Sequence, residues 1–157
     1  MTDPVREQVL AALRGGNAHA TFDDAIKSFP AALRGVTRKG LPHTAWELLE
    51  HMRLAQSDIL EFSRNPQHQS PAWPEGYWPA TRKPPNDAAW KKSIASFRKD
   101  LKAMQDLVQN PKTDLYAKIP HGTGQNILRE ALLVADHNAY HLGQFVLLRK
   151  ILGAWPD

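Results

Sequence analysis

The sequence contains no cysteine. Disulfide bonds, thiolate metal ligands and a cysteine nucleophile are therefore excluded, because each of them needs a cysteine sulfur. If the protein binds a transition metal, the ligand atoms must come from histidine, aspartate or glutamate side chains. The chain has seven histidines that are available for this purpose.

Long apolar runs are also missing. No uninterrupted apolar stretch approaches the ~20 residues that a membrane-spanning helix needs. The first residues include the charged side chains of Asp3 and Glu7 in place of the apolar core of a signal peptide. We therefore expect a cytoplasmic protein that has no membrane partner.

A concentrated positive charge is absent as well. Lys and Arg number 20 against 16 Asp and Glu, which gives a net charge of +4, but the basic residues are scattered along the chain. No arginine-rich arm, zinc-finger spacing or RNA-reading aromatic motif accompanies them. We expect a solvated basic surface and no nucleic-acid partner.

The length and composition predict a single folded domain. A chain of 157 residues can build one hydrophobic core and is short for two, so we expect one domain over residues 1–157. Hydrophobic residues make up 42% and charged residues 23% of the chain, as in globular proteins and unlike disordered ones.

Helix start and stop signals cover most of the chain. The clearest start is Thr44 followed by Glu47, a capping box in which each side chain satisfies a backbone amide of the other residue. Apolar side chains then recur at steps of three and four residues, which is the spacing of one helix face. Such signals predict helices over residues 18–28, 44–64, 87–109 and 124–152.

Shorter signals complete the helical pattern. Asp3 before Pro4 starts a first short helix that Gly15 and the following glycine end, and Asn17 is expected to cap the piece after it. Thr123, or the glycine before it, is expected to start the last helix. Since no strand pattern is found, two short pieces and three long helices predict an all-α protein, an antiparallel four-helix bundle.

One long segment lacks any periodic pattern. Residues 66–86 contain six prolines together with Trp73, Tyr77 and Trp78. A flexible linker has no use for so much aromatic area. We therefore expect this loop to be ordered, with at least one of its three aromatic side chains more than half buried.

Three histidines carry the predicted chemistry. His137 and His141 lie four residues apart on the last helix, which places both imidazoles on one side of it. His51 lies at the margin of the apolar stripe of an earlier helix. Because neutral imidazoles are good ligands for zinc, nickel, iron and copper, three of them facing one interior indicate a metal site with an open position. The alternative is that all three are core-edge histidines with ordinary hydrogen-bond partners.

Two neighbours of this pair are candidates for supporting roles. Glu130 lies two turns before His137, and Gln144 lies one turn after His141. Either side chain could orient a ligand by accepting its second ring proton. For Glu130 an ion pair with a lysine or arginine is the alternative. No residue of the sequence stands out as the general base.

The residues around the three histidines resemble a known family. The segment Trp46–His51 and the segment Asp136–Gln144, which has the form His-x-x-x-His-x-Gly-Gln, are similar to those of DinB-like proteins, also described as YfiT-like metal-dependent hydrolases. The resemblance implies a four-helix bundle with a three-histidine site for zinc, nickel or a similar divalent ion. It also implies that a homodimer is a reasonable expectation.

Several functions fit these observations. The first is a metal-dependent enzyme, a hydrolase or a thiol transferase, that acts on an unknown small molecule such as a thiol. The second is a non-catalytic metal-binding module of the stress-response type, in which the ion ties two helices together. A third is an interaction bundle without a metal.

Overall fold

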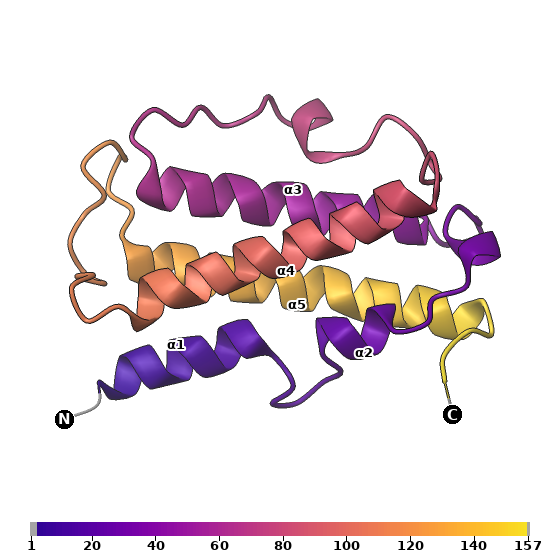
Figure 1. Ribbon diagram of the computed structural model, residues 1–157, viewed down its shortest axis with the longest axis horizontal. Helices are drawn as coiled ribbons and strands as arrows, with labels where there is room; N and C mark the ends of the chain where they lie inside the picture. Colours follow the sequence, from indigo (N-terminus) through magenta and orange to yellow (C-terminus); the bar gives the residue numbers. More distant parts are fainter. Residues whose placement is uncertain (1–2, 157) are drawn as a thin grey trace.

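The computed structural model describes residues 3–156, which fold into α-helices joined by loops (Figure 1). In chain order the elements are α1 (Pro4–Arg14), α2 (Phe22–Ile26), the 3-10 helix η1 (Ala31–Leu33), α3 (Ala45–Arg64), the 3-10 helix η2 (Glu75–Tyr77), α4 (Asp87–Gln109) and α5 (Ile127–Ile151). Within the described range there is no strand, and two isolated bridges are the β-type pairings found there. The predicted all-α fold is confirmed.

The predicted starts of α3 and α4 are correct because side chains cap both helices. The Thr44 hydroxyl accepts a hydrogen bond from the Glu47 amide, and the Glu47 carboxylate accepts one from the Thr44 amide. Asn86 caps α4 by accepting from the amide of Ala89. Each cap satisfies an amide that has no partner within its helix.

The predicted start of the second helical piece is wrong. Its cap is Thr21, which forms a capping box with Asp24, so α2 begins at Phe22. Asn17 instead donates a hydrogen bond from its side-chain amide to the carbonyl of Ala11 at the end of α1. An asparagine can serve either end of a helix, and here it serves the preceding one.

The predicted start of the last helix is also wrong, by three residues. Asn126 caps α5 by accepting from the amide of Arg129. The amide of Thr123 is bound by the Gln125 side chain in a turn that precedes the helix. Thr123 therefore belongs to the loop.

Helices α3 and α4 run in the same direction, contrary to a strictly antiparallel bundle (Figure 1). Ser93 of α4 donates to Glu50 of α3, and further along both helices Gln56 donates to the carbonyl of Phe97. The residue numbers rise along both helices from the first contact to the second, because the long loop after α3 returns along the bundle before α4 begins.

Helices α3 and α5 run in opposite directions, whereas α1 and α2 run in the same direction as α5 (Figure 1). Along α3 the contacts with α5 run from His51 with His141 to Gln56 with Asn138, so the residue numbers change in opposite directions. Helices α1 and α2 lie one after the other along the bundle and together take the place of its fourth helix (Figure 1).

Two apolar clusters fill the bundle. One lies among α2, the start of α3, the start of α4 and the end of α5, and the other lies among α1 and the opposite ends of the long helices. On α5 the first cluster begins at Leu142 and the second ends at Ala135. His137 and His141 therefore fall between the clusters.

The aromatic loop packs on the bundle as predicted. Tyr77 and Trp78 are more than half buried, whereas Trp73 is 71% exposed. The Tyr77 hydroxyl donates to Asp58 of α3 at 2.7 Å, and His68 contacts the other oxygen of the same carboxylate at 2.7 Å. These bonds fix the loop along α3. No helix in the described part of the chain is long and apolar enough to cross a membrane.

Candidate metal centre

The structure brings His51, His137 and His141 together. The Nε2 atom of His51 lies 3.1 Å from Nε2 of His141 and 3.2 Å from Nε2 of His137. One ring nitrogen of each residue lies within 4.8 Å of those of the other two. His51 is 3% exposed and His141 is 9% exposed, while His137 is partly buried. The antiparallel register of α3 and α5 produces this meeting.

The outer nitrogens of two of these rings are held by oxygen acceptors. The Nδ1 atom of His51 lies 2.8 Å from the carbonyl oxygen of Tyr77, and Nδ1 of His141 lies 2.8 Å from Oε1 of Gln144. Because such oxygens only accept, both Nδ1 atoms carry the proton in a neutral ring. The inward Nε2 atoms then present lone pairs.

This arrangement fits a metal cation. Two Nε2 lone pairs that face each other at 3.1 Å repel unless a positive charge lies near both. Nitrogens bound to one ion at ~2.0 to 2.1 Å in a tetrahedral site lie about 3.3 Å apart, close to the two short distances here. The three histidines could therefore hold a divalent ion through Nε2.

Burial favours the neutral, ligand-competent form of each ring. It lowers the pKa of His137 to about 4, and the neighbouring rings of His141 and His51 add to the effect. Burial also lowers the pKa of His51 and of His141, although the hydrogen bonds to Tyr77 and Gln144 act in the opposite direction. Near pH 7 all three rings are neutral.

A stack of aromatic rings covers one side of the site. The ring of Trp78 stacks on the ring of His51, with centroids 3.9 Å apart and an interplanar angle of 4°. Trp78 also stacks on His43, with centroids 4.2 Å apart. The sequence alone does not connect His43 or Trp78 with His51. The aromatic content of the loop was the available signal, but it did not tell which ring reaches the site.

The two predicted supporting residues have different outcomes. Gln144 contacts His141 as expected. Glu130 is buried at 2% exposure, but its carboxylate pairs with Arg129 at 2.7 Å and makes no contact with the three histidines. Of the two interpretations of Glu130, the structure supports the ion pair with an arginine and not the supporting role, because its side chain is directed to Arg129 on its own helix.

A second polar contact joins α3 and α5 beside the histidines. The Asn138 side-chain amide donates to Oε1 of Gln56 at 2.8 Å, and Gln56 donates on to the carbonyl of Phe97 at 2.7 Å. Gln56 is 1% exposed. This chain of hydrogen bonds fixes the relative height of three helices, and so it helps to hold His137 opposite His51.

Comparison with protein-family models matches residues 16–145 to the DinB superfamily. The chain belongs to the DinB superfamily. The matched region covers most of the chain and includes all three histidines and Gln144. Searches of curated proteins and of solved structures gave no match. DinB membership agrees with the helical fold and is compatible with a metal at the three-histidine group.

The lowered pKa values predict how the stability of this DinB protein depends on pH. In the metal-free protein the folded state keeps His137 neutral down to about pH 4, whereas the unfolded chain protonates it near its usual value of 6.5. The free energy of unfolding should therefore keep its full value above about pH 6.5 and fall as the pH is lowered from 6.5 to 4. The loss is at most ~1.4 kcal/mol per pH unit for each proton that the unfolded chain binds in excess of the folded protein.

Urea unfolding of metal-free protein between pH 4 and 7.5 measures this loss. His137→Asn should show a weaker pH dependence than the wild type, and His19→Asn, at an exposed position outside the site, should match the wild type. An identical pH dependence in all three proteins would contradict the burial of His137 as a neutral ring.

Proposed function

We propose that this DinB protein is a metal-dependent enzyme of the hydrolase or thiol-transferase type, whose ion, zinc or nickel, is held by His51, His137 and His141. The observation that carries the proposal is the convergence of three inward Nε2 atoms at 3.1 and 3.2 Å. Three neutral imidazoles suit zinc and nickel and leave coordination positions free.

The residues around the ligands have separate tasks in this proposal. The Tyr77 carbonyl and the Gln144 amide oxygen hold two rings in the orientation that ligation needs. Trp78 excludes water from one face of His51. A divalent ion in such a site supplies Lewis acidity, which lowers the pKa of a water or thiol that it coordinates.

A small cavity next to the ligand helix supports a substrate with an apolar part. Its volume is about 210 Å³, and His43 and Gln144 line it together with apolar side chains such as Leu41, Leu48 and Leu147. Within residues 3–156 no carboxylate is hydrogen-bonded to the three histidines. We therefore assign His43, at the rim of this cavity, the task of moving the proton of the nucleophile.

Metal content tests the site. Protein purified without a histidine tag should retain about one divalent ion per chain, and His51→Ala, His137→Ala and His141→Ala should each lower the affinity at least about tenfold, because each removes a ligand nitrogen. Elemental analysis and competition with a chelator measure the change. His121→Ala is the matched control, since His121 is exposed and contacts the carbonyl of Phe62 near the far end of α3. Equal metal content in all of these proteins would remove the basis of the proposal.

Turnover tests the chemistry. Metal-loaded protein should cleave activated esters or transfer thiols to electrophiles. His43→Asn should lower kcat by about 10- to 100-fold while metal content stays unchanged, because an amide cannot carry the proton whereas all three ligand nitrogens remain. Spectrophotometric assays of an ester panel and a thiol panel give the rates. Full metal retention together with inertness in both panels would favour a non-catalytic metal-binding role.

We also propose a homodimer formed through the outer face of α5. Leu132, Tyr140, Leu147 and Ile151 are 46 to 65% exposed and recur at helical spacing along one side of this helix. A row of apolar side chains on one helix face can be self-complementary when two copies meet around a two-fold axis. The ring of Tyr140 lies edge-on to His141 with centroids 4.9 Å apart, so the interface would lie beside the metal site.

Sedimentation velocity measures this association. Wild-type protein should sediment as a dimer at micromolar concentration, and Leu147→Glu should sediment as a monomer, since a buried unpaired carboxylate opposes association. Glu75→Gln, an exposed change away from α5, is the control. A wild type that stays monomeric at high micromolar concentration would exclude this interface.

A further inference from the structure

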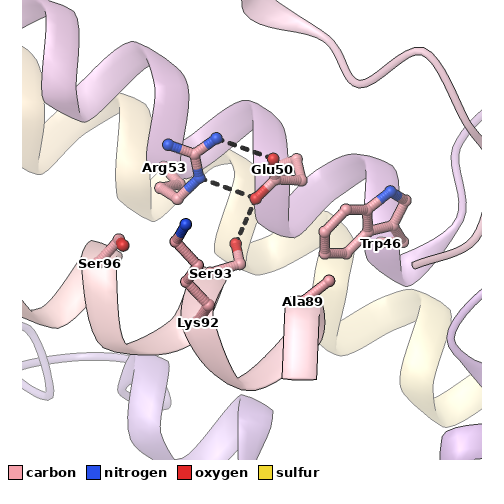
Figure 2. Close-up of a pocket in the computed structure, with 7 residues that line it drawn as sticks. All are labelled: Trp46, Glu50, Arg53, Ala89, Lys92, Ser93 and Ser96. Atoms are coloured by element: carbon pink, nitrogen blue, oxygen red, sulfur yellow. Dashed lines mark hydrogen bonds and ion pairs between the residues drawn. The ribbon is translucent and has the colours of Figure 1, made fainter. Parts of the chain in front are cut away.

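A separate pocket lies between α3 and α4 (Figure 2). It has a volume of about 270 Å³, and none of the three histidines lines it. Side chains from both helices form its walls, among them Arg53 from α3 and Lys92 and Ser96 from α4. The proposed metal chemistry uses none of these residues.

Arg53 is held in place with donors to spare. Its Nε atom donates to Oε1 of Glu50 and its Nη2 atom donates to Oε2, each at 2.8 Å. A guanidinium has five N–H donors, so three remain after this two-point contact. Glu50 also accepts from Ser93 and is 9% exposed. Its carboxylate is thus fully engaged and is not available to a ligand.

The charge state of this pair is stable. Burial tends to raise the pKa of Glu50, but the hydrogen bonds from Arg53 and Ser93 outweigh it and hold the pKa below its usual value. The hydrogen bond to Glu50 raises the pKa of Arg53. Near neutral pH the pocket therefore contains a carboxylate that is already paired and a guanidinium that is only partly engaged.

Lys92 and Ser96 add two further donors to the pocket. Within residues 3–156 neither Lys92 nor Ser96 forms an ion pair or a side-chain hydrogen bond, and both line the pocket. Figure 2 shows Lys92 extending from α4 toward the side of the pocket where Arg53 lies. Arg53, Lys92 and Ser96 thus make one end of the pocket donor-rich.

The other end is apolar. Trp46, which is 6% exposed, and the methyl group of Ala89 form this part of the lining (Figure 2). The lining charges are those of Arg53 and Lys92 against Glu50, which leaves one net positive charge. Asp100 acts on Arg53 from farther along α4 but does not line the pocket. This balance favours a singly charged anion over a doubly charged one.

We propose that the pocket between α3 and α4 binds a small organic monocarboxylate. Its carboxylate contacts Arg53, Lys92 and Ser96, as expected for charge-assisted hydrogen bonds, and its apolar group packs on Trp46 and Ala89. The pocket is smaller than the ~300 to 1,000 Å³ of sites for drug-sized ligands, so the ligand has the size of benzoate.

Titration of metal-free, isotope-labelled protein with benzoate tests the proposal, with amide chemical shifts as the readout. Absence of metal keeps the three-histidine site from contributing. Benzoate should cause saturable shifts at residues 46–53 and 89–96, and acetate, which lacks the ring, should bind more weakly. Benzylamine, which carries a positive charge, should cause no saturable shift at these residues.

Variants separate a built site from a generally basic surface. Lys92→Gln should weaken benzoate binding by about two- to fivefold, the effect of one partly exposed ion pair. Lys91→Gln, on the same helix and outside the pocket, should bind as the wild type does; Lys91 pairs with Asp87. Equal weakening in both variants, equal binding of benzylamine, or no saturable shift with benzoate would each overturn the proposal. The outcome is independent of metal binding, so this proposal can fail while the proposed enzyme stands.

Discussion

Three desolvated imidazoles whose lone pairs face one another are the constraint on which the structure around them depends. Neutral rings at 3.1 and 3.2 Å avoid the cost of burying charge but repel unless a cation lies near their Nε2 atoms. Such a contact forms only if α3 and α5 keep a fixed register, because a shift of one residue rotates a side chain by ~100°. The hydrogen bonds between Gln56, Asn138 and the Phe97 carbonyl hold that register from inside the core.

The parallel arrangement of α3 and α4 explains why the loop between Arg64 and Asp87 is so long. A tight turn after α3 would produce an antiparallel neighbour, whereas a parallel neighbour requires the chain to return along the whole helix. The returning segment passes the site, where it supplies the Tyr77 carbonyl and the Trp78 ring. The side chain of Tyr77 is held by Asp58, and its backbone carbonyl accepts the hydrogen bond from His51. The crossover is therefore part of the site.

The sequence predicted what local chemistry determines. The capping box of Thr44 and Glu47 and the spacing of His137 and His141 each involve residues within one turn, and the structure contains them. Gln144, one turn from His141, was found for the same reason. Asn126 was missed because Thr123 is an equally acceptable cap until the preceding turn is known. Trp78 was missed because an aperiodic loop has no register that tells which aromatic ring reaches α3.

Adjacent residues on α3 contact different helices, and this separation bears on the proposed metal site. Glu50 faces α4 and His51 faces α5, as a ~100° step between neighbours allows. A carboxylate one residue from a ligand histidine would otherwise be a plausible oxygen ligand, but Arg53 and Ser93 engage both oxygens of Glu50 on the far side of the helix. The candidate ligand atoms of the three-histidine site are consequently all nitrogens. A metal held there as proposed would meet nitrogen donors, which favour zinc or nickel over magnesium or calcium, since the latter two prefer oxygen.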